Sequence, residues 1–198
     1  MDKEKLKGEI EKYLNYYYDV KRAFDLYRYI KENAEIYPNE TKQISFFLHT
    51  VLISLLNNTL LDVSKILDNR NDKNIYKLLE VCNQNIKLFC EDEKNTKEKN
   101  EKLNLIKRIK EKIGFKKDLI EKLKTYRDKS LAHTEGKNKL FNEVKTTYEE
   151  IEDILEVIEE SLNELLYALC NTTYVFNDKY KNDYTYILKC IKEFRENS

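Results

Sequence analysis

One stretch of the sequence decides the fold: residues 144–169, VKTTYEEIEDILEVIEESLNELLYAL. Its apolar side chains recur at spacings of three and four, which is the repeat of an α-helix with one buried face. They are Val144, Tyr148, Ile151, Leu155, Ile158, Leu162, Leu165 and Leu169. Most of the outward positions are glutamate, so the pattern predicts a long helix with one apolar and one acidic face.

The rest of the chain follows the same helical repeat. It holds only three glycines and one proline in 198 residues, whereas sheet-rich folds need many tight turns that use both. Helices are predicted over about 3–34, 41–67, 75–90, 101–129, 144–169 and 184–196, with a bend or break at Gly114 and a polar loop over 91–100. We therefore predict an all-α fold, a bundle of five to six helices that forms a single domain over residues 1–198.

The helix predicted over 41–67 is apolar on nearly every side. A helix of this kind lies in the centre of a fold or is covered by a partner subunit. Asn57, Asn58, Asp62 and Lys65 interrupt it, and the interior of a bilayer would penalise these groups. We expect a buried helix instead of a membrane span and, because the N-terminus shows no apolar leader, a cytoplasmic protein with no membrane partner.

The four cysteines show no metal-binding pattern. Cys82, Cys90, Cys170 and Cys190 form no Cys-x-x-Cys pair and have no histidine nearby, which argues against a zinc site. We expect free thiols in a reducing compartment, with no metal and no cofactor.

The net charge is zero, but the charges are unevenly distributed along the chain. Residues 94–139 hold sixteen Lys and Arg against seven Asp and Glu, and the remaining residues carry the compensating negative excess. Such a basic stretch is either a polyanion-binding surface or a solvated helix face. Composition leaves both interpretations open.

Residues 126–133, YRDKSLAH, place an arginine and a histidine within this basic stretch. An Arg fork can hold two phosphate oxygens at once, and an imidazole exchanges protons near neutral pH. Arg127 and His133 could therefore cleave RNA through its own 2′-hydroxyl, or form a structural ion pair at a helix surface. Both are expected to be surface groups whose removal leaves the fold intact. His49, in the apolar helix, is expected to be a core or interface residue out of reach of solvent.

This stretch resembles the motif of the HEPN superfamily (higher eukaryotes and prokaryotes nucleotide-binding). In that motif an arginine precedes a histidine by a few residues, and a polar residue often follows the arginine directly. Here five residues separate Arg127 from His133, and Asp128 takes the polar position. The motif, the apolar helix before it and the helix after it are most similar to the abortive-infection (Abi) branch. The resemblance covers residues 41–170, preceded by the helix at 3–34.

The resemblance implies an HEPN-like helical bundle that forms a two-fold homodimer and brings two motifs into one cleft. Arg127 would hold the scissile phosphate, His133 would act as general acid or base, and Asp128 would orient one of the two. The RNA backbone would be bound by Lys122, Lys124 and Lys129.

The resemblance also bears on whether the chain has an antitoxin as a partner, besides RNA and a second copy of itself. Some HEPN toxins carry a tyrosine two residues after the histidine, which a partner enzyme modifies. Residue 135 here is glutamate, so this type of antitoxin is not implied. The partner in a defence system is left open.

Three functions remain compatible with the sequence. The first is a metal-independent endoribonuclease acting as a toxin or in phage defence. The second is a non-catalytic HEPN module that binds RNA or a nucleotide. The third is a helical adaptor in which the acidic face of residues 144–169 meets a basic partner.

Overall fold

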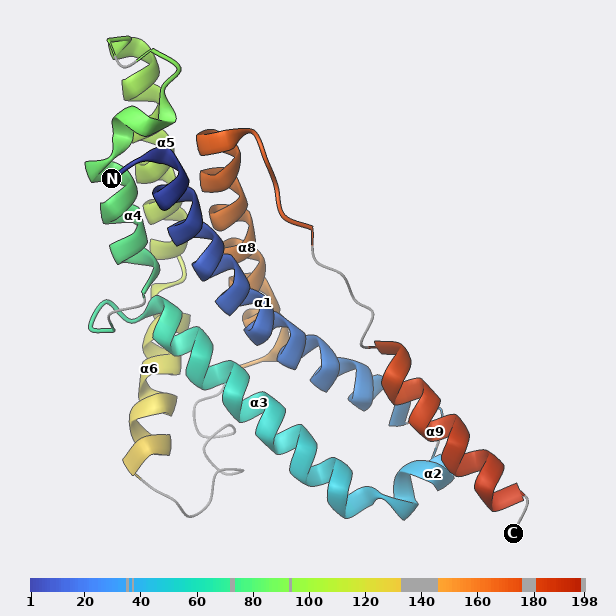
Figure 1. Ribbon diagram of the computed structural model, residues 1–198. Helices are drawn as coiled ribbons and strands as arrows, with labels where there is room; N and C mark the ends of the chain where they lie inside the picture. Colours follow the sequence, from blue (N-terminus) through green and yellow to red (C-terminus); the bar gives the residue numbers. More distant parts are fainter. Residues whose placement is uncertain are drawn as a thin grey trace. The chain divides into compact units, whose positions relative to one another are not determined.

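The computed structural model describes residues 1–34, 36, 38–71, 74–92, 94–132, 146–175 and 181–196. Within these ranges the chain forms α-helices, one 3-10 helix and connecting turns, and it contains no strand (Figure 1). The predicted all-α fold is confirmed. The helices are α1 (Lys3–Ala34), α2 (Pro38–Gln43), α3 (Ser45–Leu67), α4 (Ile75–Gln84), the 3-10 helix η1 (Ile86–Phe89), α5 (Thr96–Gly114), α6 (Lys117–Ala132), α8 (Tyr148–Cys170) and α9 (Lys181–Glu196).

The helix boundaries follow side-chain caps that the apolar repeat did not reveal. The polar loop predicted over 91–100 is wrong from Thr96 onward, because the Asn95 side chain accepts a hydrogen bond from the Glu98 amide and starts α5. The helix predicted over 75–90 ends at Gln84, where the Asn85 side chain donates to the Val81 carbonyl at 2.8 Å. The predicted break at Gly114 is confirmed, since α5 ends there.

The helix predicted from 144 onward begins at Tyr148 as α8. Thr147 and Glu150 form a capping box: the Thr147 hydroxyl accepts from the Glu150 amide at 3.2 Å, and the Glu150 carboxylate accepts from the Thr147 amide at 2.9 Å. Asn171 ends the helix in the left-handed conformation at φ 55°. Val144 lies outside the described residues.

The chain divides into two compact units, and α1 and α3 each contribute to both. Unit 1 comprises Met1–Tyr18 and Leu60–Val175, and unit 2 comprises Asp19–Thr59 and Phe176–Ser198. The prediction of one domain over the whole chain stays a prediction.

Unit 1 is built around α8. Its apolar face is fully buried along Ile151, Leu155, Ile158 and Leu162, and it packs on α5. The first half of α1 contributes buried Tyr17, whose hydroxyl donates to Glu159 at 2.9 Å. The tyrosine rings of α1 therefore belong to the core, with their hydroxyls bound to polar partners.

Unit 2 has a smaller core where the second half of α1 meets α3 and α9. Its buried members are Ile30, Leu48, Tyr184 and Leu188. Tyr29 packs against this cluster, and its hydroxyl hydrogen-bonds to that of Thr185. Three helices thus share one apolar cluster within this unit.

The expectation that the whole apolar helix is buried is wrong for the first half of α3. Phe46 and Phe47 are 86% and 62% exposed, and His49, expected to be out of reach of solvent, is exposed as well. The second half is buried in unit 1 at Leu60, Val63 and Ile66, whereas the first half buries Leu48 in the apolar cluster of unit 2 and leaves its other side exposed. By length and composition α3 could cross a bilayer, and 22% of its most apolar stretch is buried. One such helix is weak evidence for a membrane span, because the core helix of a soluble protein passes the same test.

Candidate functional site

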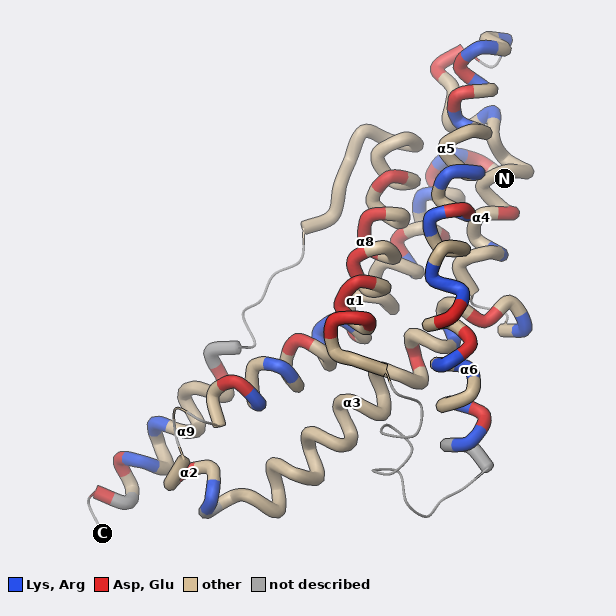
Figure 2. Tube along the Cα trace, turned by 180° about the vertical axis from the view of Figure 1, so that it is seen from behind, with Lys and Arg blue, Asp and Glu red and all other residues tan. Residues whose placement is uncertain are grey.

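The acidic face of α8 and the basic face of α5 and α6 lie against each other in unit 1. Arg108 pairs with Glu164 at 2.7 Å, and Lys122 pairs with Glu150 at 2.8 Å. Between them, ion pairs join Lys112 to Glu160 and Lys116 to Asp153. Figure 2 shows the acidic residues along α8 and the basic ones along α5 and α6. We call this row of four contacts the ion-pair ladder.

The ladder changes how the charged stretches of the sequence are interpreted. Much of the predicted basic surface faces carboxylates of the same chain. The adaptor hypothesis assigned the acidic face of α8 to a basic partner protein. Carboxylates of this face already pair with basic residues of the same chain. Of the lysines predicted to bind RNA, Lys122 contacts Glu150 and Lys124 contacts Glu121 at 2.9 Å, while Lys129 is exposed near the end of α6.

The turn after α3 forms because its own polar side chains bond its backbone. The Asp68 carboxylate accepts a hydrogen bond from the Arg70 amide at 3.1 Å, and the Asp68 carbonyl accepts from the Asn71 amide at 2.9 Å. Further along, Asn74 caps α4 by accepting from the Lys77 amide at 3.0 Å, and its side chain donates to the Asn69 carbonyl at 3.4 Å. Such aspartate and asparagine contacts are typical of tight turns.

Two tyrosines of α1 hold this region in place from the side. The Tyr16 hydroxyl donates to the Asp62 carboxylate at 3.0 Å, and the Tyr13 hydroxyl donates to the Asn74 carbonyl at 3.2 Å. The end of α3 and the start of α4 are thus both fixed to α1. Residues 68–71 consequently sit on a supported scaffold beside α6.

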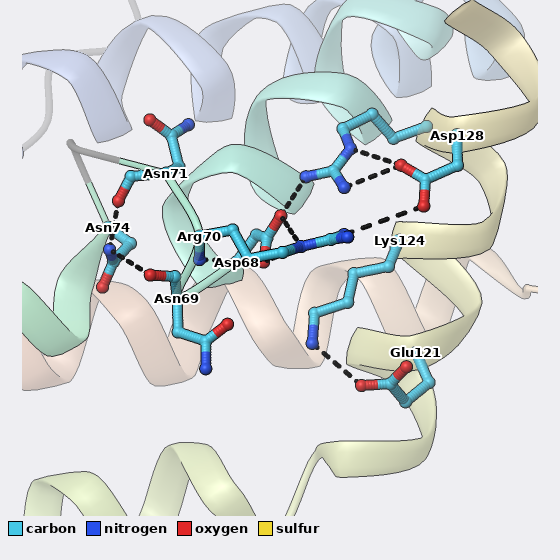
Figure 3. A network of polar contacts seen from close by, with 9 residues as sticks. Asp68, Asn69, Arg70, Asn71, Asn74, Glu121, Lys124 and Asp128 are labelled. Atoms are coloured by element: carbon cyan, nitrogen blue, oxygen red, sulfur yellow. Dashed lines mark hydrogen bonds and ion pairs between the residues drawn. The ribbon is translucent and has the colours of Figure 1, made fainter. Parts of the chain in front are cut away.

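Arg127 lies at the centre of a network of two arginines and two aspartates. Its Nη1 donates to Asp68, and its Nε and Nη2 donate to one oxygen of Asp128 at 3.0 and 2.7 Å. Arg70 donates from Nε to both Asp68 oxygens at 3.1 and 3.2 Å, and its Nη2 lies 3.7 Å from Asp128. Figure 3 shows the Arg70 side chain extended between Asp68 and Asp128. We call these four residues the Arg–Asp ring.

The four members of the ring differ in exposure. The Asp68 side chain is 2% exposed and that of Arg127 13%, whereas Arg70 is 62% exposed. The expectation that Arg127 is a surface group is therefore wrong: its contacts with Asp68 draw it into the fold. Asp128, which was expected to orient either the imidazole or the arginine, contacts Arg127.

The two carboxylates of the ring stay ionised. Burial by itself would raise the pKa of Asp68, but hydrogen bonds from Arg127 and Arg70 outweigh it and lower that pKa to about 2. The pKa of Asp128 is lowered as well, mainly by its hydrogen bond from Arg127. Two negative charges therefore balance two positive ones, and the ring is electrically neutral near pH 7.

Of the predicted catalytic residues, the structure places Arg127 and Asp128 together on α6. His133 follows α6 directly in the sequence and lies outside the described residues. Asp68 and Arg70 were not predicted as site residues, because they lie between the helices predicted over 41–67 and 75–90. One signal was available, because the chain has only six arginines and Arg70 and Arg127 are two of them.

No cluster of three or more His, Cys, Asp or Glu side chains suited to a metal ion occurs among the described residues. A cavity of about 540 Å³ lies elsewhere in unit 1, lined by residues of η1, α5 and α8 such as Phe89, Arg108 and Tyr167. No member of the Arg–Asp ring contributes to its lining. The ring is therefore separate from this cavity.

Comparison with known proteins gives one match. The model of the HEPN family described as AbiU2 matches residues 3–187, nearly the whole chain. No curated protein and no solved structure shows significant similarity to the chain. The matched range includes the ring, the YRDKSLAH stretch and most of each unit.

Proposed function

The chain belongs to the AbiU2 family of HEPN proteins, and from this membership we propose that it is a metal-independent endoribonuclease. The observation that carries the proposal is the position of Arg127. Its guanidinium is fixed by Asp68 and Asp128 on the helix that leads directly to His133. A phosphate-binding group and a proton-transferring group thus stand in the order that the HEPN motif requires.

The chemistry uses the substrate's own 2′-hydroxyl as nucleophile. The 2′-oxygen gives up its proton and bonds to phosphorus, the bond from phosphorus to the 5′-oxygen breaks, and that oxygen takes up a proton. Arg127 stabilises the negative charge that develops on the phosphate, and His133 accepts or donates a proton. The products are a 2′,3′-cyclic phosphate and a 5′-hydroxyl.

The reaction needs one proton acceptor and one proton donor. A homodimer that brings two copies of the motif together supplies two histidines, one for each role. We therefore include a two-fold dimer in the proposal. The resemblance to the abortive-infection branch makes phage defence, with cleavage of cellular or phage RNA, the biological setting that we propose.

The test is the chemistry of the RNA ends. Purified protein incubated with a mixed-sequence RNA should give fragments with 2′,3′-cyclic phosphate and 5′-hydroxyl termini, and EDTA should not stop the reaction. RNA methylated at every 2′-oxygen should resist cleavage because the nucleophile is blocked. Fragments with 3′-hydroxyl ends, or loss of activity with EDTA, would contradict the proposal.

A non-catalytic HEPN module that binds RNA is the second candidate, and the neutral charge of the Arg–Asp ring favours it. An arginine that already holds two carboxylates has less charge to offer a phosphate. The same experiment separates the two functions. RNA binding without cleavage under all conditions would support the binding module.

A further inference from the structure

We propose that Asp68 and Arg70 belong to the RNA-cleaving site, Asp68 as the residue that positions Arg127 and Arg70 as a second phosphate-binding group. This inference rests on the proposed ribonuclease function and extends it to two residues outside the Arg127–His133 motif. Both lie in the turn after α3, and α6 carries Arg127 and Asp128 of the motif. The site is therefore assembled from two segments of unit 1.

Asp68 is built to hold an arginine in one orientation. Its carboxylate is almost fully buried, and its amide donates to the Ser64 carbonyl at 2.9 Å, so that its backbone continues the hydrogen bonding of α3. Arg70 donates from Nε to both carboxylate oxygens, and Arg127 donates from Nη1 to one of them. A buried charge is tolerated only with such partners, so Asp68 fixes the direction of Arg127 more firmly than exposed Asp128 could.

Arg70 is the more accessible of the two guanidinium groups. Three donor atoms of Arg127 are already committed to Asp68 and Asp128. Arg70 is mostly exposed, and its contact with Asp128 is 3.7 Å, longer than a hydrogen bond. A phosphate oxygen can replace that contact at little cost, whereas displacing Arg127 from buried Asp68 would leave an unpaired charge in the fold.

In this arrangement the two arginines have different roles. Asp68 holds Arg70 through Nε, which leaves the outer edge of its guanidinium directed toward Asp128 (Figure 3), and the Arg70 side chain is mostly exposed. A phosphodiester bound there would lie next to Arg127, because both arginines share Asp68. Arg70 would then contribute mainly to RNA binding, and Asp68 mainly to the rate of cleavage through Arg127.

A purely structural ring makes a different prediction. In that case Arg70→Ala would change the stability of the fold and leave the kinetics of folded protein unchanged. The experiment must therefore separate KM from kcat in variants that remain folded. Arg22 provides a matched control, since it is an exposed, ion-paired arginine of unit 2, outside the basic stretch at 94–139.

We would measure cleavage of a mixed-sequence RNA by the full chain carrying Arg70→Ala, Arg70→Lys or Arg22→Ala. Loss of one bidentate phosphate contact should raise KM roughly tenfold in Arg70→Ala with a much smaller change in kcat. Arg70→Lys should recover part of this loss, because it keeps the charge without the fork. Binding of RNA methylated at every 2′-oxygen should weaken in the same order, and Arg22→Ala should behave as wild type.

Asp68→Asn tests the positioning role. It keeps the size of the side chain and removes its charge, so we expect kcat to fall at least roughly tenfold because Arg127 is no longer fixed, with RNA affinity unchanged or higher. Circular dichroism establishes that the variant is folded. If it does not fold, the Arg70 variants carry the test alone, since this exposed side chain can be replaced without disrupting a core.

The outcomes are distinct. If Arg70→Ala has the KM and affinity of Arg22→Ala, Arg70 does not bind substrate, and if folded Asp68→Asn keeps its kcat, Asp68 does not position Arg127. In both cases cleavage by the wild type leaves the proposed function standing. A wild-type chain that neither binds nor cleaves RNA would overturn the proposed function and this inference together.

Discussion

Arg127 donates a hydrogen bond to Asp68, a carboxylate 59 positions earlier in the chain, and both side chains are largely withdrawn from solvent. Through this contact α6 is tied to the end of α3. Arg127 is thus at once a candidate catalytic residue and a part of the packing of unit 1. Substitutions at this position must be interpreted with both roles in view.

The first prediction concerns stability. Arg127→Ala should lower the free energy of unfolding by about 2–4 kcal/mol, because it removes a main partner of the buried Asp68 carboxylate. Urea denaturation at pH 7 measures the change. The same substitution in an Asp68→Asn background should cost clearly less, and Arg22→Ala should stay within about 0.5 kcal/mol of wild type. Equal losses in the two backgrounds would show that the Asp68 contact is not what stabilises Arg127.

The second prediction concerns acid. The pKa of Asp68 is lowered to about 2 in the folded chain, below the value of about 3.9 for an unfolded aspartate. Its contribution is therefore fully present above about pH 4 and is lost as the pH falls toward 2; the difference between the two pKa values corresponds to about 3 kcal/mol. The difference in unfolding free energy between wild type and Asp68→Asn should shrink over this interval. A difference that stays constant from pH 5 to pH 2.5 would contradict the ionic role of Asp68.

The third prediction concerns the histidines. His133→Ala should reduce RNA cleavage by about 100-fold or more, the usual contribution of a general acid or base. His49→Ala is the matched control: His49 is exposed on α3 and lies outside the motif, so its removal should leave the rate unchanged. The measurement is the initial rate of cleavage of one RNA substrate at neutral pH by each variant and by the wild type. Equal activity of His133→Ala and wild type would refute the assignment of His133.

The fourth prediction concerns the ion-pair ladder. Glu160→Lys places a second positive charge beside Lys112 and should reduce the free energy of unfolding by roughly 0.5–1 kcal/mol. Adding Lys112→Glu reverses the pair and should restore part of the loss, because the new carboxylate also faces Glu164, which lies 3.8 Å from Lys112. Thermal or urea unfolding at low ionic strength gives the largest signal, because salt screens exposed charges. Failure of the double variant to recover would show that the pair does not contribute.

The fifth prediction concerns assembly. Light scattering at micromolar concentration should give about twice the chain mass of 23.9 kDa, since a composite site needs two motifs and since Phe46 and Phe47 expose a large apolar surface on α3. Phe46→Ser should shift the mass toward the monomer if the dimer uses this surface. Phe115→Ser, at an equally exposed phenylalanine after α5, serves as the control. A monomer at all concentrations would count against a composite site.

Much of the fold could be predicted from the sequence because helical periodicity is a local property. The first helix was placed at 3–34 and is observed as Lys3–Ala34, and Gly114 separates two helices as expected. The predictions are wrong where a helix boundary or the burial of a residue depends on individual side-chain contacts. Asn95 starts α5 inside a stretch that looks like a loop, and Phe46 and Phe47 are exposed although their apolarity suggested burial.

Only some residues of the candidate site could be predicted from the sequence. Arg127, Asp128 and His133 stand close together in the chain, so a motif could reveal them. Asp68 and Arg70 join them only through the contact between the end of α3 and α6, and through the turn after α3 that its own polar side chains stabilise. Periodicity assigns residues to a face of a helix, but it does not say which turn will meet that face.

If the chain acts on RNA as proposed, the ion-pair ladder also bears on the rate of association. Opposite charges held at hydrogen-bond distance act as small dipoles, whose field weakens far more steeply with distance than that of isolated charges and is screened within about 10 Å in physiological salt. The excess of lysine in residues 94–139 therefore does not act as a long-range attractor on the side where α5 and α6 meet α8. An RNA molecule reaching this side is not guided there, and its association rate constant should remain near the unsteered range of about 10⁵–10⁶ M⁻¹s⁻¹. Under the proposed function, capture of RNA on this side would then depend on unsteered diffusion.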